Sequence, residues 1–130
     1  MKALLSLCVA LAIMSLPHVA SAHDVGLTKQ HAACMDKSGG TTVGMIDCIT
    51  AETKRQDVQL NKVYKALMAE LSAPRKTQLQ EAQRAWIKYR DVNCGFYYDP
   101  DGGTLAAVNA NDCVMSATAN RARELENFKP

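Results

Sequence analysis

The chain has 130 residues, a length that suits one domain, and its 15 lysine and arginine residues nearly balance its 13 aspartate and glutamate residues. The formal net charge of +2 at pH 7 argues against a nucleic-acid-binding protein and against strong attraction to an anionic membrane.

The first 22 residues have the pattern of a cleavable signal peptide. Lys2 supplies a positive charge, residues 3–16 form an almost wholly apolar run, and residues 20–22 (Ala-Ser-Ala) resemble a signal peptidase site. The apolar run is shorter than the roughly 20 residues of a membrane span. We therefore expect a mature protein of residues 23–130, a single domain that is periplasmic or secreted.

The cysteines predict disulfide bonds rather than thiol chemistry or a metal site. Cys8 lies in the signal segment without the small residue that a lipid-attachment cysteine needs before it, so we expect no membrane anchor. The other four, an even number in a small exported chain, predict two disulfides. Sequence alone allows three pairings. We favour the local one, Cys34 with Cys48 and Cys94 with Cys113, in which each bond would stabilise the fold by about 3 kcal/mol.

Two helices are expected in the first part of the mature chain. A short helix over about residues 28–37 should end at Ser38-Gly39-Gly40, because glycine tolerates the backbone of a turn. Thr41 or Thr42 can then cap a second helix with its side-chain oxygen. One amphipathic face of that helix is marked by residues three and four apart, namely Met45, Cys48, Ile49, Glu52, Gln56, Leu60, Val63, Tyr64, Leu67 and Leu71.

Two further helices are expected after Ser72-Ala73-Pro74, since proline suits the first turn of a helix. The third stops before the turn-rich residues 99–103 and the fourth covers about Asn111 to Leu125. Only Gly95–Tyr98 has a weak strand pattern. The third helix repeats the amphipathic spacing through Leu79, Ala82, Gln83, Trp86, Ile87, Arg90 and Cys94.

These segments predict an all-α fold, a small disulfide-stapled bundle of three to four helices. Because the second and third helices are joined by a short connection, we expect them to form an antiparallel hairpin on which the other helices pack.

Polar residues recur on the expected inner faces of this hairpin. If the faces meet, Asn61, Gln83 and Arg90 should be partly buried and should bond one another or a carboxylate, since unpaired buried polar groups are costly. The cluster is interpreted first as a structural network and second as a polar ligand pocket. Its members are Asp57, Asn61, Tyr64, Gln83, Trp86, Tyr89 and Arg90.

The segment Ala82–Asp91, AQRAWIKYRD, followed by Cys94, resembles the central block of the LprI-type lysozyme inhibitor family. The resemblance covers about residues 34–125. It implies a helical periplasmic protein that binds lysozyme and blocks it non-covalently, and it carries over no catalytic or contact residues. Three further blocks agree in order: Met45-Ile46-Asp47-Cys48 with Glu52; Leu60-Asn61 with Tyr64 and Leu67; and Cys113 with Thr118, Arg121 and Leu125.

An inhibitor that plugs a sugar-binding cleft needs a protruding, rigid loop, and host lysozymes are commonly basic. Two glycine-rich connections qualify, residues 38–42 and residues 99–104. We favour the second, because acidic residues including Asp112 accompany it and aromatic residues are common interface anchors. The residues expected to contact the partner are Tyr97, Tyr98, Asp99 and Asp101.

No catalytic or nucleotide-binding motif is present, so we expect neither an enzyme nor a cofactor. Asp99-x-Asp101-Gly102 lacks the later ligands of a calcium loop. His23 and His31 could hold copper, but two exposed histidines are the simpler interpretation, and no metal site is predicted. The alternative to an inhibitor is a periplasmic interaction or ligand-binding module of the same fold with a different partner. The sequence does not specify an oligomeric state.

Overall fold

The computed structural model describes residues 26–128, and these residues form four helices. The all-α class and the disulfide-stapled bundle predicted from the sequence are confirmed. The expected signal peptide, residues 1–22, lies outside the described part of the chain. None of the four helices has the length and apolar character that a membrane span requires. The helices are α1 (Lys29–Lys37), α2 (Thr42–Glu70), α3 (Ala73–Phe96) and α4 (Gly103–Asn127).

The ends of α1 and the start of α2 are set by local hydrogen bonds. The Thr28 hydroxyl caps α1 by accepting from the backbone N–H of His31 at 3.2 Å. Gly39 and Gly40 reverse the chain with φ of 61° and 72°, which favours glycine. Thr41 then caps α2 by accepting from Gly44 N–H, so the predicted turn and cap are both confirmed.

The third helix, α3, begins at Ala73 and has Pro74 in its first turn, as predicted from Ser72-Ala73-Pro74. Gly95–Tyr98, which had only a weak strand pattern, forms no strand, because α3 continues through Phe96. The expected start of the fourth helix near Asn111 is wrong. α4 begins at Gly103, since the turn ends there and Ala106 and Val108 are already buried in the core.

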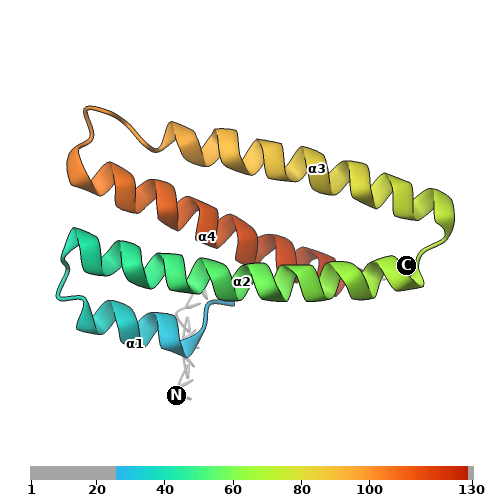
Figure 1. Cartoon of the computed structure of the whole chain (residues 1–130), viewed down its shortest axis with the longest axis horizontal. Helices are drawn as coiled ribbons and strands as arrows, with labels where there is room; N and C mark the ends of the chain where they lie inside the picture. The colour runs from blue at the N-terminus through green and yellow to red at the C-terminus, as the bar shows by residue number, and fades with distance from the viewer. Residues whose placement is uncertain (1–25, 129–130) are drawn as a thin grey trace, which may run out of the picture.

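The helices lie roughly side by side, with α4 between α3 and α2 and with α1 against the other side of α2 (Figure 1). α1 with α2 and α3 with α4 form antiparallel pairs, which agrees with a bundle built on an antiparallel hairpin. The main helix contact, however, joins α2 to α4, which run in the same direction. α2 and α3 are antiparallel, but they diverge from their short connection, and α4 fills the space between them.

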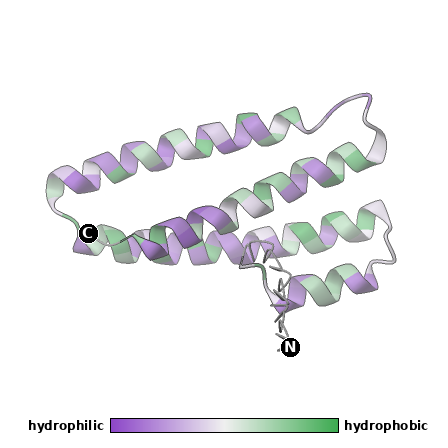
Figure 2. Cartoon of the chain, turned by 180° about the vertical axis from the view of Figure 1, so that it is seen from behind, coloured by the Kyte–Doolittle hydropathy of each residue, from purple (hydrophilic) through white to green (hydrophobic). Residues whose placement is uncertain are grey.

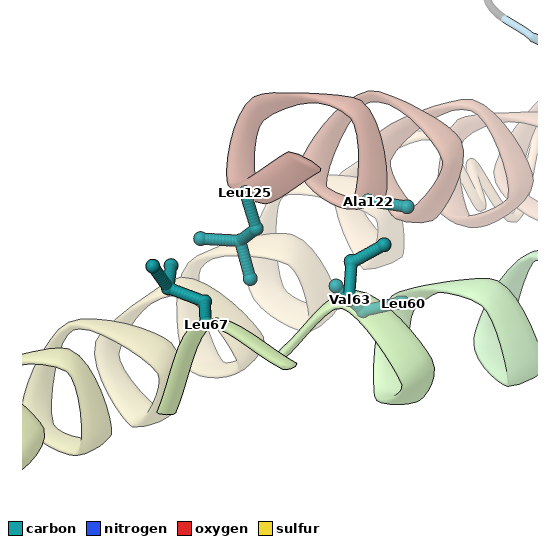
Figure 3. Packing of buried hydrophobic residues seen from close by; sticks show 5 residues of the cluster. All are labelled: Leu60, Val63, Leu67, Ala122 and Leu125. Carbon is teal, nitrogen blue, oxygen red and sulfur yellow. The ribbon is translucent and has the colours of Figure 1, made fainter. Parts of the chain in front are cut away.

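Two apolar clusters join α2 to α4 along their length. One contains Ile49, Val108 and Met115 near the start of the helices. In the other, the side chains of Val63 and Leu125 point toward the opposite helix (Figure 3). The members of this second cluster are Leu60, Val63, Leu67, Ala122 and Leu125.

Small residues on α4 explain why it is the closest partner of α2. Ala119 and Ala122 are buried, and short side chains allow two helix axes to approach. α3 buries only Cys94 among its 24 residues. Figure 2 shows hydrophobic and hydrophilic residues interspersed along every helix, as expected for helices with one buried face.

Candidate functional site

The two disulfides each hold a pair of neighbouring helices together. Cys34–Cys48 joins α1 to α2 and Cys94–Cys113 joins α3 to α4, with Cα–Cα distances of 5.6 and 5.4 Å. The local pairing favoured from the sequence is therefore confirmed. Cys94 lies two residues before the end of α3 and Cys113 lies ten residues into α4, so the second disulfide closes a loop that contains the α3–α4 connection and the first turns of α4.

The α3–α4 connection is an ordered turn. Tyr97 and Tyr98 continue the helix by donating their N–H groups to the carbonyl oxygens of Cys94 and Gly95, at 3.2 and 3.0 Å. Asp99 then closes the turn, because its side chain accepts from Asp101 N–H at 2.9 Å and its carbonyl oxygen accepts from Gly102 N–H at 3.0 Å. The loop is thus held by its own hydrogen bonds as well as by the disulfide.

Aromatic side chains of this connection face solvent. We define residues 96–101 as the tip surface. Phe96 is 86% exposed, Tyr98 is 62% exposed and Tyr97 is half-exposed. Burying aromatic rings is strongly favourable, so rings left in solvent on a rigid turn indicate a surface suited to a partner. Tyr97 and Tyr98 belong to the predicted contact loop, whereas Phe96 was not predicted.

Charge is distributed unevenly between the two ends of the molecule. Residues 91–120, which include the tip surface, contain four aspartates and no lysine, arginine or histidine. Residues 62–88, at the α2–α3 connection, contain six lysines and arginines and two glutamates, a net charge of +4. These segments lie largely at opposite ends of the long axis (Figure 1). The tip is therefore locally acidic although the whole chain is slightly basic.

The predicted polar cluster is assembled mainly on α3 and α4. Arg121 donates through Nε to Gln83 Oε1 at 3.0 Å, and the guanidinium groups of Arg90 and Arg121 lie 5.1 and 5.8 Å from the Trp86 ring centroid. Arg90 also donates to the Thr118 hydroxyl at 3.4 Å. Gln83, Trp86 and Arg90 thus meet as expected around Arg121 of α4. Arg90 also pairs with Asp91 of its own helix at 2.8 Å, so the expected bond to a carboxylate is present as well.

The other members of the predicted cluster are not joined to this group. Asn61 is exposed and donates to the Asp57 carbonyl of its own helix, so its expected partial burial is wrong. Tyr89 is 66% exposed on the outer side of α3, because its position is turned away from α4. Tyr64 packs beside the second apolar cluster. Asn61, Tyr64 and Gln83 do share one shallow groove of about 290 Å³ between α2 and α3.

A second buried polar group, which the sequence did not reveal, is centred on Glu52. Its carboxylate is fully buried and accepts from Thr28 N–H at 2.8 Å, Thr28 Oγ1 at 2.6 Å, Arg55 Nε at 2.7 Å and Gln56 Nε2 at 2.7 Å. Burial raises the pKa of Glu52, but these hydrogen bonds, first those from Thr28 and Gln56, outweigh burial and lower the pKa to about 2. Gln56 also donates to Gly26 O, so the group ties the start of the described chain to α2.

His31 is buried rather than exposed, contrary to the simpler interpretation of its role. It lies on the short helix α1, where burial against α2 was not evident from so few residues. Within residues 26–128, no group of three or more histidine, cysteine, aspartate or glutamate side chains is placed to hold a metal ion. His23 lies outside the described residues.

The family model for lysozyme inhibitor LprI matches residues 34–125 of this chain. An uncharacterized protein of Rhizobium meliloti (strain 1021), R02472, is 29% identical over 93 residues, which cover 61% of this chain and 67% of the relative. No solved structure matches. Residues 34–125, which the family model matches, contain both disulfides, the polar group around Trp86 and the tip surface.

Proposed function

The chain belongs to the LprI lysozyme inhibitor family, and from this premise we propose that it is an exported binding protein that inhibits lysozyme through its tip surface. Residues 23–130 would act in the periplasm or outside the cell after removal of residues 1–22. In this proposal the protein blocks the enzyme non-covalently, which is supported by the pairing of all four cysteines of residues 23–130 in disulfides, since none of them then offers a free thiol.

The observation that carries this proposal is the composition of the tip surface. It combines Phe96, Tyr97 and Tyr98, all exposed, with the carboxylates of Asp99 and Asp101 and no basic residue. Aromatic residues commonly anchor an interface, and carboxylates speed encounter with a basic partner. A basic lysozyme is complementary to such a surface.

Rigidity of the tip supports the same function. A loop that is already ordered loses little conformational freedom on binding, which leaves more of the contact energy for affinity. The Cys94–Cys113 disulfide and the turn closed by Asp99 supply that order. Tyr97 and Tyr98 would fill apolar parts of the lysozyme surface, while the two aspartates would pair with basic side chains around them.

The proposal is tested by a lysozyme turbidity assay with the oxidised mature protein. Tyr97→Ala with Tyr98→Ala should weaken inhibition by about tenfold or more, since truncated interface aromatics commonly cost at least about 1–2 kcal/mol. Asp99→Asn with Asp101→Asn should mainly slow association and reduce its dependence on salt.

Asp36→Asn is the matched control, because Asp36 is an exposed carboxylate near the rival turn at residues 38–42. It should leave inhibition unchanged. Loss of inhibition on altering residues 38–42 alone would contradict the choice of the tip. No inhibition at a large molar excess against several lysozyme types would support the alternative, a periplasmic interaction or ligand-binding module with a different partner. The shallow groove shared by Asn61, Tyr64 and Gln83 is the feature that favours that alternative.

A further inference from the structure

A second candidate binding site lies at the end of the molecule opposite the tip. It is a groove of about 330 Å³, which we call the basal groove, and α2, α3 and α4 all contribute to it. Its size falls at the lower end of the range for small-molecule sites, about 300–1,000 Å³. The lining residues are Leu67, Leu71, Arg75, Gln78, Leu79, Ala82, Arg121, Glu124, Leu125 and Phe128.

The floor of the basal groove is aliphatic. Leu67 and Leu125 belong to the buried cluster between α2 and α4, and Leu71 and Leu79 pack against the same cluster while staying partly exposed. On the α3 side the groove is lined by Arg75, Gln78, Leu79 and Ala82. An apolar chain seated here would cover leucine surface that water now contacts, and burial of such surface is favourable.

The rim of the groove carries two cations and one anion. Arg121 is already engaged, since its side chain is nine-tenths buried, bonded to Gln83 and paired with Glu124 at 2.8 Å. Arg75 donates to Gln78 Oε1 at 2.8 Å and lies 5.9 Å from the Phe128 ring centroid. No carboxylate of residues 26–128 lies within ion-pair distance of Arg75.

Within residues 26–128, Arg75 is therefore the one positive charge on the rim that has no ion-pair partner. The surrounding residues 62–88, with their net charge of +4, add to the attraction for an anion. A guanidinium group binds a carboxylate through parallel N–H donors, so Arg75 is suited to the head of a fatty acid.

We propose that the basal groove binds a free medium-chain fatty acid, with its alkyl chain on the leucine floor and its carboxylate at Arg75. This site is separate from the tip surface and does not depend on inhibition of lysozyme. A volume of about 330 Å³ suits a medium-length alkyl chain better than a long-chain lipid held in a bilayer.

Isothermal titration of the mature protein with decanoate, below the concentration at which decanoate forms micelles, tests this proposal. Saturable binding at one site is expected. Butyrate, which has the same head and almost no chain, should not bind measurably. The neutral monodecanoyl glycerol should bind about tenfold more weakly than decanoate, because it lacks the charge-assisted hydrogen bonds.

Two pairs of variants locate the site. Arg75→Ala should weaken decanoate binding by about tenfold and leave monodecanoyl glycerol binding unchanged, whereas Arg84→Ala, an exposed arginine of the same helix outside the groove, should change neither. Ala82→Phe should fill the groove and weaken binding of both probes by about tenfold or more. Ala69→Phe, at an exposed position of α2 outside the groove, is its control.

Several results would overturn the proposal. These are the absence of saturable decanoate binding, decanoate binding that Ala82→Phe leaves intact, and equal losses in Arg75→Ala and Arg84→Ala. Binding to anionic phospholipid vesicles but not to decanoate would identify a membrane surface as the ligand instead. Ala82→Phe should leave lysozyme inhibition unchanged, which separates failure of this proposal from failure of the proposed function.

Discussion

Glu52 offers the most direct test of how the fold is held together. Glu52→Gln keeps the shape of the side chain but replaces one carboxylate oxygen with an NH₂ donor. In the wild type, each carboxylate oxygen accepts two hydrogen bonds. Oε1 accepts from Thr28 N–H and Gln56, and Oε2 accepts from the Thr28 hydroxyl and Arg55. In either orientation the new amide would therefore place a donor against donors.

The size of the effect follows from the pKa of Glu52. Folding lowers this pKa from 4.5 to about 2, so the ionised form favours the folded state. At about 1.4 kcal/mol per unit, the group contributes about 3 kcal/mol at pH 7. Because the folded pKa is the lower one, this contribution is complete above about pH 5 and falls to about 1 kcal/mol at pH 3.

Urea unfolding of the wild type and of Glu52→Gln at pH 7, 5 and 3 measures this contribution. The variant should be less stable by about 3 kcal/mol at pH 7, and the difference should shrink by about 2 kcal/mol at pH 3. Glu70→Gln, an exposed position on the same helix, should change stability by less than about 0.5 kcal/mol at every pH. A Glu52→Gln difference below about 1 kcal/mol at pH 7, or one that does not vary with pH, would refute the assignment.

Three further predictions concern the α3–α4 unit. Replacing Cys94 and Cys113 together by serine removes a disulfide that spans a sequence separation of 19, and it should lower the free energy of urea unfolding by about 3 kcal/mol. A decrease below about 1 kcal/mol would contradict a stabilising role for this disulfide. Arg121→Ala should reduce the free energy of unfolding by about 2 kcal/mol, because the hydrogen bond to Gln83 and the cation–π contact with Trp86 are lost. The fluorescence emission of Trp86, the single tryptophan, should shift, and unchanged emission would argue against the cation–π contact. Gly103→Ala should destabilise by about 1 kcal/mol because its φ is +64°, whereas Gly95→Ala in the last turn of α3, where a Cβ meets no neighbouring atom, should stabilise by about 0.5 kcal/mol; a stabilising Gly103→Ala in thermal unfolding would contradict the turn geometry.

The helices and their boundaries followed from local chemistry. Turn residues and caps act within a few positions, so Ser38-Gly39-Gly40, Thr41 and Pro74 were sufficient to place three helix ends. The fourth helix was placed too late, since the amphipathic pattern was followed back only to about Asn111, whereas the helix begins at Gly103. Burial of Ala106 and Val108 against α2 favours the earlier start.

The arrangement of helices in space depended on contacts far apart in the chain. Adjacent segments were expected to pair, yet the alanines of α4 let it approach α2 more closely than the polar face of α3 does. The same arrangement gives Gln83 and Arg90 hydrogen-bond partners on α4, while Arg90 also keeps an ion pair with Asp91 of its own helix. Glu52 was recognised as a face residue, but its bonds to Thr28, 24 positions away, could not be read from periodicity. The exposure of Phe96 likewise depends on where α3 ends relative to α4.

The proposed contact surface for lysozyme is tested most directly by hydrogen exchange of backbone amides, measured by mass spectrometry on the mature protein alone and with a basic lysozyme in excess. We predict that peptides spanning residues 96–104 become protected on complex formation, while those spanning residues 38–42 and the basal groove exchange as before. Protection confined to residues 38–42, or no change at residues 96–104 in a complex that does form, would contradict binding through the tip.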